Sequence, residues 1–114
     1  MDTRLKMVGP EEAARIAAAG ATVVSGYFDP LLASHAERLA GLKREGTPLL
    51  VVIAPLASGI LAPRARAELV AGLKSVDYVT EAALVPHIRL EDEHLASFTR
   101  LVAHVRSRQS AAAS

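Results

Sequence analysis

Apolar residues along this chain gather in short runs that alternate with longer stretches of helical periodicity. The run at residues 49–53 contains only Leu, Val and Ile, and the run at residues 21–25 is β-branched at its centre and bounded by glycines. Short runs of this kind are typical of strands covered on both faces of a parallel sheet. We expect a third strand to begin at residues 76–79 and a short fourth strand at residues 87–90.

Helix-starting and helix-ending residues separate these runs. A helix is predicted over residues 10–20, because Pro and two glutamates favour its start and Gly favours its end. Asp29 is interpreted as the N-cap of a second helix over residues 30–44. Two further helices are expected at residues 64–75 and 91–108, each with a buried apolar stripe.

This order of elements predicts the fold class. Strands that alternate with helices form a parallel sheet between two helical layers, so we expect a three-layer α/β/α Rossmann-like domain in a short version. One such domain is predicted to occupy residues 1–109, with no internal repeat or linker. Residues 110–114 are expected to form a disordered tail.

Composition narrows the functional classes. The formal net charge is +1 and only 4% of residues are aromatic, which argues against a nucleic-acid partner. The longest uncharged segment, residues 47–63, is interrupted by Pro55 and Gly59 and is too short to span a bilayer. The lack of cysteine excludes disulfides and thiolate catalysis. We therefore expect a cytoplasmic protein that contacts neither nucleic acid nor membrane.

The segment GYFDPLLASH, residues 26–35, lies where the first strand turns into the second helix. It resembles the signature G-x-F-D-x-x-H-x-G-H of the cytidylyltransferase-like nucleotidyltransferases. Four positions of that signature are retained: Gly26, Phe28, Asp29 and His35. Leu32 stands at the first His of the signature, and Ser34 stands at its second Gly.

The resemblance continues to about residue 80. Lys43 has the spacing from His35 of a family lysine that reaches toward nucleotide phosphates. Arg66 opens a Leu-rich stretch that leads to Val-Asp-Tyr-Val at residues 76–79, which is similar to a later family pattern. The chain looks most similar to glycerol-3-phosphate cytidylyltransferase and to heptose-phosphate adenylyltransferase domains.

The resemblance implies transfer of CMP or AMP from CTP or ATP to a phosphorylated small molecule, with Mg²⁺ as the cofactor of an active member. It implies catalytic roles for His35 and Lys43. It also implies a nucleotide- and phosphate-binding set made of Gly26, Tyr27, Phe28, Ser34 and Arg66. A helix N-terminus that points at the phosphates would contribute backbone N–H donors.

Departures from the family predict weak or absent turnover. Leu32 offers no hydrogen bond, and the loss of one transition-state donor costs about 100- to 1000-fold in rate. The loop at residues 54–62 carries no charge, and no segment similar to the family's R-T-x-G-I-S-T-T follows Val79. A non-catalytic domain of the same fold, acting by self-association or partner binding, is therefore the alternative, with the neutral loop as its interface and a homodimer as its expected state.

A third alternative is another doubly wound fold, such as a flavodoxin-like or receiver-like regulator. The end of the first strand lacks the acidic cluster of a phospho-receiver. One architecture nevertheless hosts many functions, so the fold alone does not select the activity.

The candidate residues also have plain structural interpretations. His35 would be a partly exposed helix histidine or one that is hydrogen-bonded to a neighbouring carbonyl. Lys43 and Arg66 would be solvated residues on helix surfaces. Asp77 is interpreted as structural. No His, Asp and Glu grouping has the spacing of a metal site, so we expect no protein-held metal.

Overall fold

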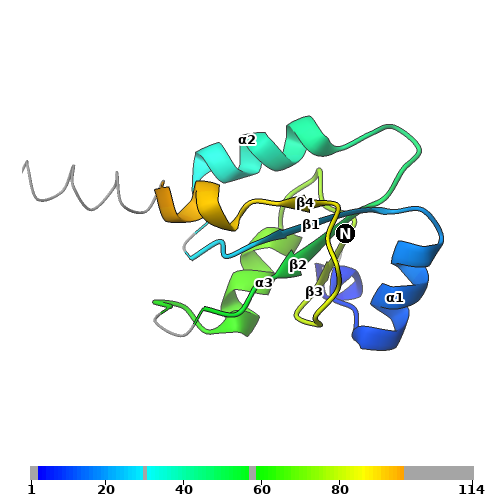
Figure 1. Ribbon diagram of the computed structural model, residues 1–114, viewed down its shortest axis with the longest axis horizontal. Coiled ribbons are helices and arrows are strands. Elements are labelled where there is room, and N and C mark those ends of the chain that lie inside the picture. Colours follow the sequence, from blue (N-terminus) through cyan, green and yellow to red (C-terminus); the bar gives the residue numbers. More distant parts are fainter. Residues whose placement is uncertain (1–2, 30, 57–58, 97–114) are drawn as a thin grey trace, which may run out of the picture.

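The computed structural model describes residues 3–29, 31–56 and 59–96, and it confirms an α/β fold with an all-parallel sheet (Figure 1). The sheet has four strands in the order β3-β2-β1-β4. They are β1 (Thr22–Gly26), β2 (Leu49–Ile53), β3 (Tyr78–Thr80) and β4 (Ile88–Arg89). β1 pairs with β2 along its whole length, whereas β4 pairs with β1 over two residues.

Helices flank this sheet. A short 3₁₀ helix, η1 (Thr3–Lys6), precedes α1 (Pro10–Ala18), α2 (Ala33–Leu42) and α3 (Pro63–Ala71). Residues 91–96 are helical and follow β4 directly. Each connection between consecutive elements is short, which is typical of a compact α/β domain.

Alternating strand residues bury two apolar clusters, one on each face of the sheet. The first cluster joins the strands to α2 and α3 and contains, among others, Val24, Val51, Leu39 and Val70. The second joins them to α1 and contains, among others, Val23, Leu50 and Ala13. β2 is buried at all five positions because it lies inside the sheet and is covered on both faces.

The connection from β3 to β4 sets the position of the candidate site. Residues 81–87 form neither helix nor strand, and Leu84 packs against the cluster on the α1 face. Because β4 lies on the opposite side of β1 from β2, the strand order reverses at β1. In open α/β sheets, ligands bind beyond the carboxyl ends of the strands at such a reversal.

Several predicted bounds differ from those observed. The second helix begins at Ala33 with Leu32 as its N-cap residue, so Asp29 is not the N-cap as the sequence had indicated. Its carboxylate instead accepts hydrogen bonds from backbone N–H groups of the loop after β2. α3 ends at Ala71, four residues earlier than predicted, because Gly72 follows. β2 has the predicted bounds.

Two predictions fall outside the described residues: the continuation of the last helix over residues 97–108 and the tail at residues 110–114. Within the described part of the chain, no helix is long and apolar enough to cross a membrane.

Candidate functional site

The turn that follows β1 has a strained backbone. Phe28 is fully buried and has a φ of 50°, which lies in the left-handed region that aromatic residues rarely adopt. Strain of this kind persists where surrounding contacts hold it, and it is concentrated at functional sites. In this conformation, the backbone N–H groups of Tyr27 and Phe28 both donate to Nδ1 of His94, at 2.9 and 3.3 Å.

His94 is a site residue that the sequence analysis missed. The sequence predicted a helix over residues 91–108 without a role for His94, but this residue is 95% buried against the turn after β1. Burial, and to a smaller extent repulsion from His35, together lower the pKa of His94 to about 3. The available signal was spacing: position 94 precedes Phe98 and Leu101 by four and seven residues, which places it on the predicted apolar stripe.

His35 lies in the first turn of α2, where the signature places its last histidine. Its Nδ1 accepts a hydrogen bond from the Leu32 backbone N–H at 3.2 Å, so the ring caps the helix. The side chain is 94% buried, which corrects the alternative of a partly exposed histidine. Burial lowers the pKa of His35, and the negative charge of Glu93 acts weakly in the opposite direction.

Arg66 is a buried cation rather than a solvated helix residue. It is 1% exposed, and its Nη1 donates to the Tyr27 carbonyl at 3.0 Å and to the Ala54 carbonyl at 2.9 Å. Among the described residues, no carboxylate forms an ion pair with it. Because a buried charge without a counter-ion is costly, the guanidinium makes this edge of the sheet favourable for an anion.

The other predicted binding residues are only partly brought together. Tyr27 is half-buried beside the Arg66 contact, whereas Ser34 is exposed on the first turn of α2. Gly26 ends β1, and a Cβ placed there would lie 2.3 Å from His94 Cε1. The resemblance placed Gly26 in the nucleotide-binding set, but in the structure the space beside its Cα is occupied by the imidazole ring of His94.

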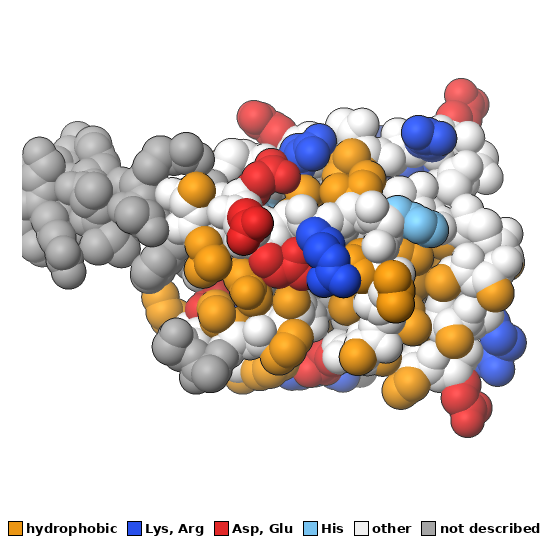
Figure 2. Space-filling model, viewed as in Figure 1, with side chains coloured by type: hydrophobic (Ala, Val, Ile, Leu, Met, Phe, Trp, Pro, Cys, Tyr) orange, Lys and Arg blue, Asp and Glu red, His pale blue; other side chains and the backbone are white. Residues whose placement is uncertain are grey.

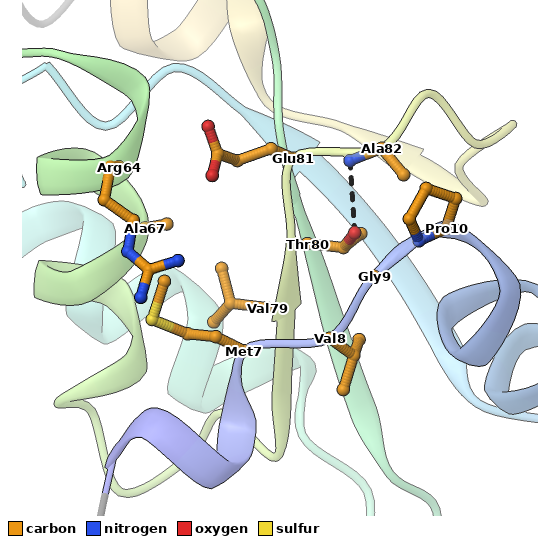
Figure 3. A pocket seen from close by; sticks show the side chains of 10 residues that line it. All are labelled: Met7, Val8, Gly9, Pro10, Arg64, Ala67, Val79, Thr80, Glu81 and Ala82. Atoms are coloured by element: carbon orange, nitrogen blue, oxygen red, sulfur yellow. Dashed lines mark hydrogen bonds between the residues drawn. The ribbon is translucent and has the colours of Figure 1, made fainter.

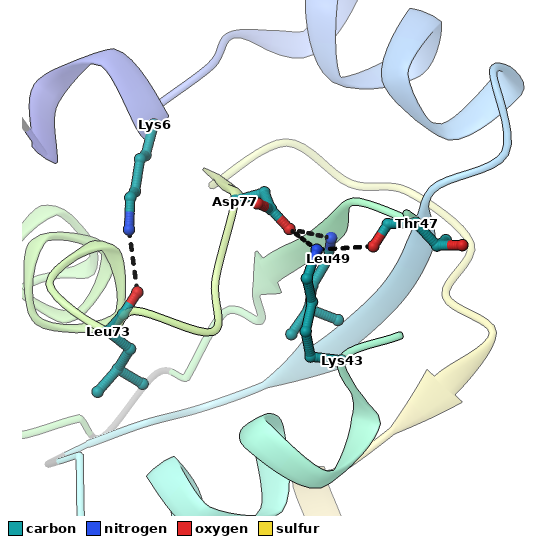
Figure 4. Close-up of polar contacts among 6 residues, drawn as sticks. All are labelled: Lys6, Lys43, Thr47, Leu49, Leu73 and Asp77. Carbon is teal, nitrogen blue, oxygen red and sulfur yellow. Dashed lines mark hydrogen bonds and ion pairs between the residues drawn. The ribbon is translucent and has the colours of Figure 1, made fainter. Parts of the chain in front are cut away.

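Lys43 lies at the opposite edge of the sheet and does not join this set (Figure 4). Its Nζ donates to Asp77 Oδ2 at 2.6 Å and to the Thr47 carbonyl at 2.8 Å. The same Asp77 oxygen accepts the backbone N–H of Leu49, the first residue of β2. The resemblance assigned Lys43 a catalytic role together with His35, but the two residues lie at opposite ends of α2.

Unpartnered polar atoms concentrate around the end of β1. Five buried side-chain atoms in the described part of the chain have no hydrogen-bond partner: Ser25 Oγ, His35 Nε2, Arg66 Nε, Glu91 Oε2 and His94 Nε2. Ser25 belongs to β1, and Arg66 and His94 form hydrogen bonds with Tyr27 or Phe28. The His35 ring lies near the Phe28 ring, and Glu91 directly follows Leu90, whose N–H donates to the Ser25 carbonyl. Native proteins leave few such atoms unpaired, so a cluster of them indicates an absent partner.

An open cavity of about 340 Å³ lies against this cluster. It is lined by Tyr27, Ala54, Pro55, Arg89, Glu91 and Asp92. Tyr27 and Ala54 are also the residues whose carbonyls accept hydrogen bonds from the Arg66 guanidinium, so the cavity and Arg66 share two residues. On the face shown in Figure 2, acidic side chains gather near a basic one over the middle of the molecule.

A second cavity, of about 470 Å³, lies between η1, the start of α1, α3 and the end of β3 (Figure 3). Two of its polar side chains have partners: Thr80 Oγ1 accepts the Ala82 N–H, and Arg64 pairs with Glu68. None of its lining residues carries a buried unpaired side-chain atom among the described residues. A third cavity, of about 290 Å³ at the start of β1, likewise has no lining residue with a buried unpaired side-chain atom among the described residues. The cavity of about 340 Å³ is therefore the candidate site.

No three His, Asp or Glu side chains of the described residues lie close enough together to hold a metal ion. We therefore assign no step to a metal held by the protein. In comparisons with known proteins, no family model matches the chain, and no curated protein is similar to it at a significant level.

Proposed function

We propose that this chain is a nucleotidyltransferase-like domain that binds a nucleoside triphosphate, CTP or ATP, at the carboxyl edge of β1. The observation that carries this proposal is the buried Arg66 guanidinium without a carboxylate partner, whose carbonyl acceptors belong to two residues that line an open cavity. A phosphate oxygen would supply the missing negative charge. The signature resemblance at residues 26–35 supports the same ligand class.

The α2 N-terminus favours an anion in the same place. Its first turn carries no acidic residue, so free backbone N–H groups and the helix dipole remain uncompensated. The α1 start, by contrast, carries Glu11 and Glu12 in its first turn. Of these two helices, α2 is the one suited to a phosphate.

The carboxylates that line the cavity are suited to accept hydrogen bonds from the nucleoside part of the ligand. These are Glu91 and Asp92, and Glu91 Oε2 is a buried acceptor without a donor. Ribose hydroxyls and the amino group of cytosine or adenine are donors of the required kind. Carboxylates would repel phosphates, so the ligand would lie with its phosphates toward Arg66 and its nucleoside toward Glu91.

Catalysis would be weak in this domain. Nucleotidyl transfer requires donors that stabilise charge on the phosphoryl oxygens. Leu32 has none, Ser34 is exposed, and Lys43 is engaged by Asp77 at the other edge of the sheet. Mg²⁺ would enter as part of the triphosphate complex. We place the domain in the cytoplasm, where nucleotides are available and its lack of cysteine is usual.

A thermal-shift and calorimetric screen against CTP, ATP, GTP and UTP, each with and without Mg²⁺, tests the proposal. We expect CTP or ATP to raise the melting temperature in step with concentration. Arg66→Met should weaken binding at least tenfold. Arg64→Met is the matched control, because Arg64 lies on the same helix but is exposed and paired with Glu68. If millimolar ligand leaves the melting temperature of the wild-type protein unchanged, the proposal is contradicted. If a nucleotide binds, an assay of diphosphate release measures the residual turnover.

A second candidate function rests on Ile60. This side chain is 68% exposed, and its loop is held in place because Asp29 accepts the N–H groups of Ile60 and Leu61. A fixed, exposed apolar residue on an uncharged loop suits self-association as a non-catalytic homodimer. Sedimentation of Ile60→Asp tests this candidate, with Val85→Asp as the control because Val85 is 87% exposed on a different segment.

A further inference from the structure

Two histidines from distant parts of the chain stack beside the end of β1. The ring centroids of His35 and His94 lie 4.1 Å apart, with their planes tilted by 36°. The Phe28 ring completes the group, 4.4 Å from His94 and 5.9 Å from His35. This arrangement brings a residue from the start of α2 next to one that follows the edge strand β4.

The backbone determines which nitrogen of each ring carries the proton. His35 Nδ1 accepts the Leu32 N–H, and His94 Nδ1 accepts the N–H groups of Tyr27 and Phe28. A nitrogen that accepts a hydrogen bond has no proton, so each neutral imidazole carries its proton on Nε2. Both rings therefore present an Nε2–H donor.

Neither donor has a partner. Nε2 of His35 and Nε2 of His94 are both buried without a hydrogen bond, on side chains that are 94% and 95% buried. An unsatisfied buried donor costs free energy, and here two such donors belong to stacked rings. A ligand acceptor that reaches either ring would satisfy its donor.

Gly26 is what allows this pair to form. An added Cβ would lie 2.3 Å from His94 Cε1, 2.8 Å from His94 Nδ1 and 2.8 Å from the Phe28 ring. The missing side chain at the end of β1 is therefore filled by the His94 imidazole. The close approach requires glycine for steric reasons, independently of any turn conformation.

We propose that His35 and His94 together form a two-donor site for a phosphoryl oxygen, in which His94 supplies a second imidazole from outside the signature segment. This inference rests on the proposed function and adds His94 to its binding residues. The donors are neutral, because burial lowers the pKa of both rings. A transition metal is disfavoured at this pair, since binding through Nε2 would move each proton to Nδ1, where it would face a backbone N–H.

Ligand entry requires the covering elements to separate, because both Nε2 atoms are sealed from solvent. α2 and the residues that follow β4 are joined at the surface by an ion pair between Arg38 Nε and Glu93 Oε1, at 3.3 Å. Both side chains are about half exposed, so the pair is weak and easily opened. Arg38→Gln should leave ligand affinity unchanged or raise it by up to about fivefold.

Calorimetry with inorganic diphosphate and with CTP–Mg²⁺ on the full chain tests the site. His94→Asn retains an amide oxygen near the Nδ1 position for the turn after β1 but lacks the Nε2–H donor. We expect it to bind about 10- to 100-fold more weakly than wild type. His87→Asn is the matched control, because His87 Nδ1 also accepts a backbone N–H, from Val23, but lies away from the site. Its affinity should stay within twofold of wild type.

Long-range ¹H–¹⁵N spectra of the wild-type protein give a readout that needs no variant. Both histidines should be neutral with Nε2 protonated, and diphosphate should shift both Nε2–H signals. If the wild-type protein binds and these signals do not move, or if His94→Asn binds as tightly as wild type, this inference is overturned while the proposed function stands. If the wild-type protein binds neither probe, both are overturned.

Discussion

The amino edge of the sheet, where the strands begin, and its carboxyl edge, where they end, each hold a cation that donates to backbone carbonyls. Only the cation at the amino edge also has a carboxylate partner among the described residues. At the amino edge, the Lys43 ammonium, the Asp77 carboxylate, the Thr47 carbonyl and the Leu49 N–H satisfy one another within 2.8 Å (Figure 4). At the carboxyl edge, Arg66 has carbonyl partners but no carboxylate, and both histidines keep an unpaired donor. Complete satisfaction is typical of structural polar groups, whereas the unpaired groups at the carboxyl edge are the ones on which the proposed ligand site rests.

Asp77 at the amino edge and His94 at the carboxyl edge change their charge in different ranges of pH. Burial would raise the pKa of Asp77, but hydrogen bonds from Lys43 and Leu49 and the charges of Lys43 and Lys6 together lower it. The pKa of His94 is lowered by burial and by its neighbour His35. The first group therefore stays charged when folded, and the second stays neutral.

The largest predicted effect comes from filling the space at Gly26. Gly26→Ala should destabilise the protein by about 2–3 kcal/mol and lower Tm by roughly 15 °C, because the new Cβ collides with His94 and Phe28. Gly41→Ala is the matched control, since a Cβ at this position in α2 meets nothing within 4 Å. The control should be neutral or stabilising by up to about 1 kcal/mol. Equal Tm values for the two variants would contradict the close packing of His94.

A smaller effect is expected from mild acid. A histidine whose pKa is lowered by folding contributes stability above its ordinary pKa, and this stability is lost as pH falls toward the folded value. With a folded pKa of about 3, His94 should cost about 2 kcal/mol between pH 7 and pH 5. His35 acts in the same direction, while Glu93 opposes it.

Thermal unfolding from pH 7 to pH 4 measures this loss, and His94→Asn should flatten the curve. His87→Asn should leave the curve unchanged in shape. A wild-type Tm that is constant over this range would show that the His94 ring is not held neutral.

The amino edge should respond less, and only in stronger acid. Asp77→Ala should cost about 1 kcal/mol, because the buried Leu49 N–H loses its acceptor while the half-exposed Lys43 regains water. Asp77→Asn should cost less, since the amide oxygen retains the Leu49 bond. In the wild type, the contribution of this carboxylate is present above its ordinary pKa and is lost as pH falls through the lowered folded value.

Urea unfolding measures these costs, and calorimetry with CTP supplies the second readout. Neither Asp77 variant should change ligand affinity by more than twofold, because the ion pair lies at the opposite edge of the sheet. A tenfold loss of affinity would place Lys43 in the binding site after all.

The smallest effect on stability is expected at Ile60. Ile60→Asp should change the free energy of unfolding by less than about 0.5 kcal/mol, because the side chain is 68% exposed. Its sedimentation behaviour should shift toward the monomer if the loop after β2 is an interface. If Ile60→Asp and the wild-type protein sediment with the same mass distribution, self-association through this loop is contradicted and nucleotide binding remains as the proposed function.

Local sequence was sufficient for most of the fold. The continuous run in β2 has no polar face, so a strand buried on both sides was its favoured state, and the observed bounds agree. The start of α1 at Pro10 follows from the fixed φ of proline. The α2 start was placed three residues early, because Asp29 and Pro30 resemble a helix start while the Asp29 carboxylate binds a distant loop.

The same reasoning from neighbouring residues predicted only part of the candidate site. His35, Arg66 and the turn at residues 26–28 lie on segments whose motifs or spacing can be recognised from nearby residues. His94 could not be assigned in this way, because its partners Tyr27 and Phe28 are more than 60 residues away in the sequence. Lys43 was misplaced for a related reason: ten residues of helix carry it to the far edge of the sheet from His35.

Patterns of neighbouring residues thus predicted the strands and most of the helix positions, because periodicity and capping act over a few residues. The burial of Arg66, the pairing of the two histidines and the need for glycine at position 26 arise from packing between elements. Burial and unpaired donors depend on which distant groups fill the same space, and that information exists only once the chain has folded.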